Sequence, residues 1–425
     1  MNTYIKRTVL ILLMIAMLFL FSCSEEKDPS DTGYKAWLEN CFDGAYYTYI
    51  EDNINGYCTL QYYLLPNSRE DAETLENTAQ VVCSDTLCMH NTESCPAYRK
   101  RNGTLLFVID REESEKRGSP VLMYLDGNSL REYDVADNRV TELAKLDEKI
   151  HSTTEMWLYK GKIYLYGADG EMKGTFFCLN RNGKLLHTFT PEFSDTIAFL
   201  FLGLYRDHIY YQNPLGQFYR VDPDMTKEEY LFETDLLQGS GIADGYLYYC
   251  KDMRTEDIGH NTQAGLCTLY RRKIQNNGEL GKEQAVDDRV YCSYFGPYMT
   301  IHDGVCLYCR AAENPVYVGT NYGEERIDGT RPEANFFYAE DGKLYTPDAA
   351  TGKPKVVYDG IDGSVTMFKY ADSDCAVCNV SKAVQIDGQW KWESADVYFD
   401  FKNKYSHVIR EIPEIIYNPN PASFD

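Results

Sequence analysis

Positive charge is scarce in this sequence. Its 425 residues include 42 Lys and Arg against 65 Asp and Glu, which gives a formal net charge of −23. Nucleic acids and anionic lipid surfaces are bound through clustered Lys and Arg, so this balance argues against both as extended partners. Two short basic runs, Arg99–Arg101 and Arg271–Lys273, do not change the balance, and we expect them at solvated strand ends. We therefore expect no nucleic-acid partner.

The short motifs that mark common catalytic and cofactor sites are also missing. The chain contains no G-x-S-x-G, no H-E-x-x-H, no phosphate-binding glycine loop and no D-x-[DN]-x-[DN]-G calcium loop. Asp222-Pro223-Asp224 and Asp372-Ser373-Asp374 carry oxygen ligands for a cation, but such triplets are more often turns with side-chain to backbone bonds. We assign no catalytic and no cofactor-binding residue from the sequence.

No apolar run is long enough to span a bilayer. The longest, Val9 to Phe21, has 13 residues, whereas a membrane-spanning helix needs about 20. It follows Lys6-Arg7, so residues 1–22 are predicted to be a signal peptide. The run ends in Leu20-Phe21-Ser22-Cys23, which resembles the lipobox of bacterial lipoproteins.

The lipobox resemblance implies that Cys23 is lipidated and becomes the mature N-terminus. The protein would then be anchored in the cell membrane by its lipid, facing outside the cytoplasm. The alternative is an ordinary secretory signal with an incidental cysteine. Ser24 to Thr32 is polar, charged and proline-containing, so residues 23–33 are predicted to form a lipidated, flexible tether ahead of a folded domain at 34–425.

Tyrosine is abundant, with 36 residues against 4 Trp, while helical periodicity is nearly absent. Tyrosine suits strands, because its ring covers a sheet face while its hydroxyl reaches water or a neighbour. A turn signal followed by an alternating β-prone run recurs along the chain. Its marker positions are Gly44, Gly103, Gly161, Asp207, Gly245 and Gly304, with a degenerate copy at Asp372–Val377.

A strand precedes most markers and a second turn and further strands follow, which predicts a four-stranded antiparallel meander for each repeat. We therefore predict an all-β fold, a single β-propeller of about seven four-stranded blades, with six or eight as alternatives. Asp341–Tyr345 is interpreted as a second strand within blade six rather than an eighth marker, and Ser68–Thr78 as a polar insertion loop. The main alternative fold is a pair of β-sandwiches.

This repeat pattern resembles bacterial lipoprotein β-propellers of unknown function, whose blades are similar to those of low-density-lipoprotein-receptor-type propellers. The resemblance covers nearly the whole mature chain and implies the propeller fold. The receptor-type Tyr-Trp-Thr-Asp signature is not present. The resemblance assigns no ligand and no site residue.

Fourteen cysteines are present, and lipidation of Cys23 leaves thirteen, an odd number for a closed disulfide framework. Those at predicted strand positions are expected to be buried and reduced, as small hydrophobic residues. The seven are Cys178, Cys250, Cys267, Cys306, Cys309, Cys375 and Cys378. The last four form two C-x-x-C motifs, but residues three apart on a strand face opposite sides, so these are poor redox or metal motifs.

Cys83, Cys88, His90 and Cys95 form a different kind of group, in a turn-rich segment between the first and second blades. Three thiolates and an imidazole make a complete tetrahedral ligand set for a structural zinc ion. A disulfide between two of the three cysteines, with His90 exposed, is the alternative in an exported protein. We expect this segment to run from the outer edge of blade one back toward the central channel.

The favoured functional hypothesis is a membrane-anchored binding platform that recognises a protein, peptide or glycan without catalysis. Propellers commonly serve as rigid scaffolds whose loops carry specificity. The alternative is an exported polysaccharide hydrolase or lyase with carboxylates gathered at the propeller axis. A pair of carboxylates roughly 5 to 10 Å apart at the axis would favour the enzyme, and a pocket without carboxylates would favour binding.

Overall fold

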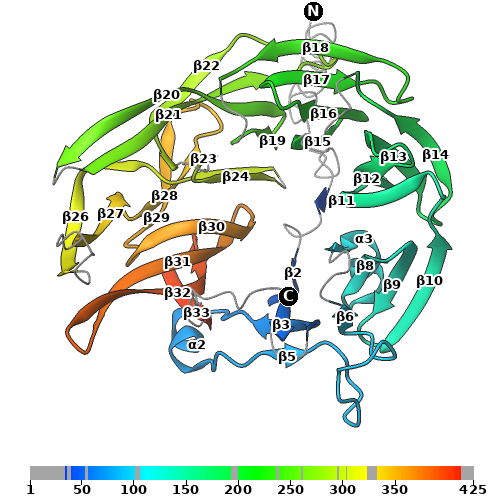
Figure 1. The fold of residues 1–425 in the computed structure, drawn as a ribbon, viewed down its shortest axis with the longest axis horizontal. Helices are drawn as coiled ribbons and strands as arrows, with labels where there is room; N and C mark the ends of the chain where they lie inside the picture. Colours follow the sequence, from blue (N-terminus) through cyan, green and yellow to red (C-terminus); the bar gives the residue numbers. More distant parts are fainter. Residues whose placement is uncertain are drawn as a thin grey trace, which may run out of the picture.

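The computed structural model of this protein describes residues 34–35, 40–52, 56–100, 106–192, 200–235, 239–259, 262–293, 296–302, 304–322 and 333–412. Within these ranges seven antiparallel sheets, each built on four strands, surround a central axis as a seven-bladed β-propeller (Figure 1). The predicted all-β propeller is confirmed. The predicted signal peptide, Cys23 and the predicted tether lie outside the described residues.

Each blade is numbered here from its innermost to its outermost strand. Blade one contains β2 (Cys41–Phe42), β3 (Ala45–Asp52), β4 (Tyr57–Leu64) and β5 (Gln80–Val81), and blade two contains β7 (Phe107–Ile109), β8 (Val121–Asp126), β9 (Ser129–Asp134) and β10 (Arg139–Lys145). Blade three contains β11 (Ile150–Tyr159), β12 (Lys162–Asp169), β13 (Gly174–Asn180) and β14 (Leu185–Phe189).

The remaining blades follow the same order. Blade four contains β15 (Leu200–Tyr205), β16 (His208–Gln212), β17 (Gln217–Val221) and β18 (Glu228–Glu233). Blade five contains β19 (Gly241–Ala243), β20 (Tyr246–Gly259), β21 (Thr262–Lys273) and β22 (Gln284–Ser293), with the short β23 (Gly296–Pro297) at its edge. Blade six contains β24 (Met299–His302), β25 (Val305–Tyr308), β28 (Lys343–Pro347) and β29 (Pro354–Asp359), and blade seven contains β30 (Ser364–Ala371), β31 (Cys375–Ile386), β32 (Gln389–Asp400) and β33 (Tyr405–Ile412).

Most of the predicted markers are tight turns between the first and second strands of a blade. In blade one, Phe42 pairs with Ala45, so Asp43 and Gly44 alone form the loop. Their φ values are +48° and +72°, the left-handed backbone that a two-residue type I′ turn requires. Glycine adopts it without strain and aspartate tolerates it, which is why this pair recurs at the start of blades.

Blade two departs from the prediction. The strand that follows the predicted marker Gly103 is β7, which is the innermost strand of the blade, whereas the markers of other blades precede the second strand. Asn102 and Gly103 themselves lie outside the described residues. A helix, α3 (Arg111–Arg117), follows β7 in place of a tight turn. The helix begins where the Asp110 side chain accepts a hydrogen bond from the Glu113 backbone N–H, and it ends at Gly118, whose φ is +67°.

Two insertions also differ in detail from the sequence-based expectations. The predicted loop at Ser68–Thr78 contains a helix, α2 (Arg69–Thr74), with Ser68 as its N-cap. Asp341–Tyr345 does belong to blade six, but it leads into that blade's third strand, β28. Between β25 and β28 the chain forms an extra hairpin, β26 (Ala311–Tyr322) and β27 (Glu333–Glu340).

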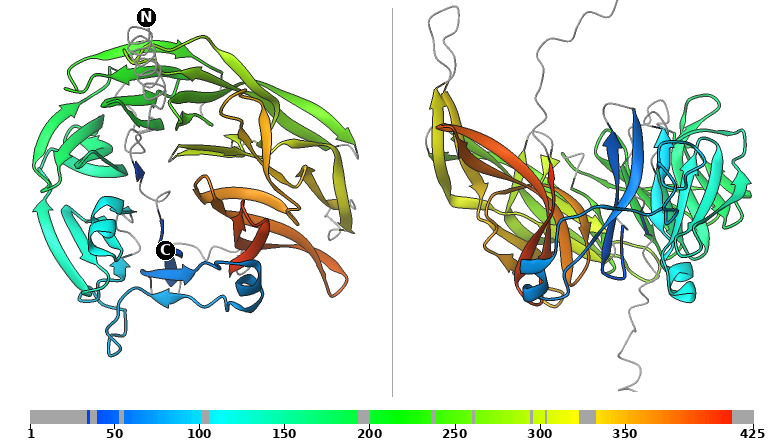
Figure 2. Two further views of the ribbon diagram at one scale, coloured as in Figure 1. Left: turned by 180° about the vertical axis from the view of Figure 1, so that it is seen from behind. Right: turned by 90° about the horizontal axis from the view of Figure 1, so that it is seen from below.

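Blades one and seven pack against each other, and no strand among the described residues is shared between them. Buried side chains from both blades form one cluster, which includes Tyr46, Tyr63, Tyr398 and Tyr405. The Tyr405 hydroxyl donates to the Pro66 carbonyl at 2.7 Å, which joins positions far apart in the chain. Figure 2 shows α2 lying beside blade seven, at this junction.

Tyrosine dominates the interior, as expected from its abundance. Of the twelve largest fully buried side chains, eight are tyrosines. Six of the seven strand cysteines are buried and Cys375 is half-buried, which confirms most of that prediction. Cys306 and Cys309 belong to different hydrophobic clusters, so the two sulfurs of this C-x-x-C pair face opposite sides of the strand. No helix within the described ranges is long and apolar enough to cross a membrane.

Candidate functional site

The four predicted zinc ligands lie on a loop that interrupts the outermost strand of blade one. Both β5 and the short β6 (Tyr98–Lys100) pair with β4, and residues 82–97 connect them. The loop is closed at its base by Leu60, whose N–H donates to the Ala97 carbonyl at 2.8 Å and whose carbonyl accepts from the Val82 N–H at 3.2 Å. The segment therefore projects at the outer edge of the blade, and the expected return toward the channel is wrong for these residues.

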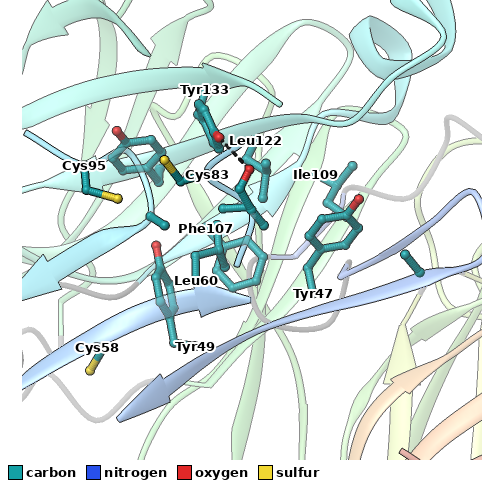
Figure 3. Close-up of a cluster of buried hydrophobic side chains, with 14 residues drawn as sticks. Tyr47, Tyr49, Cys58, Leu60, Cys83, Cys95, Phe107, Ile109, Leu122 and Tyr133 are labelled. Carbon is teal, nitrogen blue, oxygen red and sulfur yellow. Dashed lines mark hydrogen bonds between the residues drawn. The ribbon is translucent and has the colours of Figure 1, made fainter. Parts of the chain in front are cut away.

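The two backbone hydrogen bonds of Leu60 bring together cysteines that are twelve positions apart in the sequence. Cys83 directly follows Val82 and Cys95 lies two residues before Ala97, so pairing at Leu60 places both at the neck of the loop. Figure 3 shows the two side chains near each other at one end of a buried cluster, beside Tyr133. The Tyr133 hydroxyl supports the neck by donating to the Val82 carbonyl at 2.8 Å.

The ligand atoms of Cys83, Cys88, His90 and Cys95 all lie within 4.8 Å of one another. The His90 Nδ1 atom is 3.4 Å from the Cys95 sulfur. In a tetrahedral zinc site the separation between a sulfur and a nitrogen ligand is about 3.5 Å, and that between two sulfurs is about 3.8 Å. These four side chains could therefore hold a metal ion, and their ligand types are compatible with zinc. Cys83, Cys88 and Cys95 are free thiols, so the structure shows no disulfide in this loop.

Local turns direct the other two ligands inward. The Asp85 side chain accepts from the Leu87 N–H at 2.9 Å, and its carbonyl accepts from the Cys88 N–H at 3.1 Å. His90 has a φ of +55°, and its backbone N–H donates to the Cys88 sulfur at 3.4 Å. Such N–H to sulfur bonds orient thiolate ligands and stabilise their negative charge.

The protein environment disfavours a free thiolate at this site. Burial, together with the neighbouring Cys88 and Cys83 thiols, raises the pKa of Cys95 to about 12. Metal binding must therefore release protons, because thiolates rather than thiols bind zinc. The site is expected to hold metal more weakly as the pH falls.

Arg99 adds an unexpected positive charge beside the cluster. Its side chain is 6% exposed, so the expectation that this basic run is solvated is wrong at Arg99. The guanidinium lies 3.7 Å from the centre of the Tyr124 ring and donates to the Pro96 carbonyl at 2.9 Å. Its Nε and Nη2 atoms have no hydrogen-bond partner in the described structure. Zinc with three thiolates and one imidazole carries a net charge of −1, which such a buried cation would balance.

A second candidate site, here called the channel pocket, is a cavity among blades three to six, whose innermost strands face the central axis of the ring in Figure 1. The cavity there has a volume of about 260 Å³. Trp157 and Phe201 form its aromatic wall, with ring centroids 4.9 Å apart. A Cβ atom at Gly203 would lie 3.4 Å from the Trp157 ring, an ordinary van der Waals contact, so the backbone φ of +142° is what favours glycine beside the indole.

None of the described residues that line this channel pocket is acidic. They are Trp157, Leu200, Phe201, Leu202, Gly239, Ser240, Pro297, Met299, Thr300 and Ile301. Sequence analysis missed all of them, because they come from four blades and share no motif. Ser240 is one of the polar residues in this lining, and its hydroxyl has no hydrogen-bond partner in the described structure.

Three carboxylates of blades two and three are engaged by other side chains. Asp110, at the end of β7, forms an ion pair with Arg181. Glu132 on β9 accepts from Arg117 and from Arg181, each at 2.8 Å. On β11, Glu155 accepts a 3.4 Å bond from the Trp157 indole. The ion pairs of Asp110 and Glu132 with Arg181 join blade two to blade three. No two free carboxylates face each other across the channel pocket among its described lining residues.

The comparisons with known proteins show similarity of fold only. No protein-family profile and no curated protein sequence matches the chain. Among solved structures, the β-propeller domain of the Trilobed protease from Pyrococcus furiosus is 12% identical with a TM-score of 0.42, over 92% of this chain and 99% of that one.

Two further structures show a similar level of likeness. The Pyrococcus horikoshii acylaminoacyl peptidase is 10% identical with a TM-score of 0.43, and the match covers 88% of this chain and 59% of that one. The tricorn protease is 8% identical with a TM-score of 0.38, over 87% of this chain and 39% of its own. Sequence identities and TM-scores this low say nothing about activity. The propeller assignment is based on the seven sheets of this chain.

Proposed function

We propose that this protein is a lipid-anchored propeller outside the cytoplasm that binds a protein, peptide or glycan in its channel without catalysis. The observation that carries the binding role is the channel pocket, whose described lining combines apolar and aromatic side chains with the hydroxyls of Ser240 and Thr300 and contains no carboxylate. Such a lining fits recognition by burial of apolar surface. It does not supply the acid and base that hydrolysis of a glycosidic bond requires.

The anchor is proposed from the sequence. Leu20-Phe21-Ser22-Cys23 follows a positive segment and an apolar run of signal-peptide length. A lipid on Cys23 would hold the propeller near a membrane surface, with residues 24–33 as the tether. A rigid ring on a flexible tether suits a protein that captures a partner at that surface.

We further propose that Cys83, Cys88, His90 and Cys95 hold a structural zinc ion. Four protein ligands complete the tetrahedral coordination, so no position is left for water or substrate, and the metal would fix the loop rather than catalyse. The free thiols and the 3.4 Å separation between His90 Nδ1 and the Cys95 sulfur support zinc over a disulfide.

Affinity capture with a pocket variant tests the binding role. Ser240→Tyr places a large side chain in the pocket at a residue whose hydroxyl bonds to nothing described. Ser406→Tyr, on the exposed outer strand β33, is the matched control. A ligand captured from the native cell envelope should be lost with Ser240→Tyr and retained with Ser406→Tyr. Equal capture by both variants, or shortening of a bound glycan, would contradict the proposal.

A further inference from the structure

Sulfur-bearing side chains of blades five and six lie in one buried cluster. Cys250 on β20, Cys267 on β21 and Cys292 on β22 are 0%, 0% and 2% exposed and belong to the same hydrophobic cluster of blade five. Met299, on β24 of blade six, packs against this cluster. The Cys250 thiol donates to the Met299 thioether, with 3.4 Å between the two sulfur atoms. A thioether and a thiol from different blades are therefore in direct contact.

The strand register places the three cysteines in a diagonal row. Cys250 lies opposite Leu269, and Cys267 comes two residues before Leu269, on the same face of the sheet. Cys267 in turn lies opposite Val290, two residues before Cys292. The pKa of Cys267 is raised, and the largest cause is its hydrogen bond with the Cys250 thiol, while the hydrogen bond with Cys292 opposes the rise. The Cys267 thiol is thus a neighbour of both other thiols.

This set differs from the other buried cysteines of the propeller. A single buried cysteine acts as a small hydrophobic residue and needs no further role. Cys178 of blade three is an example, and its thiol is hydrogen-bonded to the Tyr164 hydroxyl rather than to sulfur. Two thiols beside a thioether form a group of soft ligands, and such ligands select soft metal ions, above all Cu⁺.

An ion has a path to these sulfur atoms. Met299 is half-buried and lines the channel pocket, whereas Cys250 and Cys267 are fully buried. An ion that enters the channel pocket therefore meets the thioether first and the thiols behind it. A metal site needs such an entry path as well as a suitable ligand set.

We propose that Cys250, Cys267 and Met299 form a binding site for Cu⁺ at the junction of blades five and six. When one of the two thiols loses its proton, Cu⁺ and its three sulfur ligands carry no net charge. Zn²⁺ on the same ligands would leave a positive charge in an apolar cluster, which is costly. This site is separate from the metal loop of blade one, and it does not depend on the proposed ligand of the channel.

Counting bound copper in variants of the purified full-length protein tests the proposal. The reduced protein is equilibrated with Cu⁺ and a competing chelator without oxygen, and copper per chain is measured by elemental analysis. Wild type should hold one Cu⁺ more than Cys250→Ala/Met299→Leu. The metal loop is unchanged in both proteins, so any copper that it binds cancels in the difference. Cys178→Ala/Met156→Leu, which removes two equally buried sulfur atoms in blade three, should keep the wild-type count.

Met299→Leu alone tests the thioether. Leu preserves the side-chain volume, so the fold should be kept. The variant should bind this Cu⁺ about tenfold more weakly or worse, because one of its three soft ligands is lost. Equal copper counts in wild type and Cys250→Ala/Met299→Leu, or an unchanged affinity of Met299→Leu, overturn the inference. If zinc rather than copper is the ion that the double variant loses, the assignment to Cu⁺ is wrong.

Discussion

Replacing Glu340 by Gln should stabilise the propeller above pH 7 and leave its stability unchanged near pH 4.5. Glu340 ends β27 and is 6% exposed. The Ser364 hydroxyl donates to its carboxyl at 2.7 Å. Burial is the largest cause that raises the pKa of Glu340 from 4.5 to about 7, the Ser364 bond opposes it, and the charge of Asp341 adds to the rise.

The sign follows from proton binding in the two states. Between pH 4.5 and 7 the folded protein keeps a proton on Glu340 that the unfolded chain releases. The contribution of Glu340 to the free energy of unfolding is therefore fully present below pH 4.5 and is lost as the pH rises through 7. A difference of about 2.5 pKa units corresponds to roughly 3 kcal/mol at most. Gln imitates the neutral carboxyl, so the variant should escape this loss.

Thermal unfolding at two pH values is the assay. With an unfolding entropy of about 2 cal/mol/K per residue for close to 400 residues, roughly 3 kcal/mol corresponds to a rise in Tm of about 4 °C. Glu340→Gln should show that rise at pH 8 and almost none at pH 4.5. Glu313→Gln, at an exposed position of β26, is the control and should change neither. An equal Tm shift of Glu340→Gln at both pH values would refute the reasoning.

Further predictions concern the anchor, the metal centre and the ring. Cys23→Ala should move the protein from the membrane to the soluble fraction and abolish lipid labelling; retention after a carbonate wash contradicts the lipid anchor. The protein prepared without chelator should contain close to one zinc per chain by elemental analysis, and His90→Ala should lose most of it. If His90→Ala keeps its metal, the site is wrong. Arg99→Met should weaken zinc retention against a competing chelator by about 10- to 100-fold, the effect of losing a supporting residue, while the exposed Lys100→Met should not; equal retention refutes the charge argument. Deleting the chain from Val365 onward should prevent cooperative folding, seen by circular dichroism during heating, because blades one and seven pack against each other. Cooperative melting of the truncated chain would instead indicate independent units.

Much of the fold could be predicted from the sequence because its signals are local. A two-residue turn that needs positive φ at both positions selects pairs such as Asp43-Gly44, and strand propensity follows in the next residues. The repeat of that local pattern predicts hairpins and hence blades. The candidate metal ligands could also be named from residue type alone, since Cys83, Cys88, His90 and Cys95 make a complete zinc ligand set if they meet.

The tertiary structure decided what depends on contacts between distant positions. Leu60 closes the loop that brings Cys83 and Cys95 together, and nothing near either cysteine in the sequence indicates Leu60. Burial of Arg99 results from stacking on Tyr124 in the next blade, so a basic run that looks solvated contains a buried charge. The channel pocket brings together residues of four blades that lie far apart in the sequence. Composition and spacing report local conformational preference, whereas a residue's neighbours across blades are set by the packing of the whole chain.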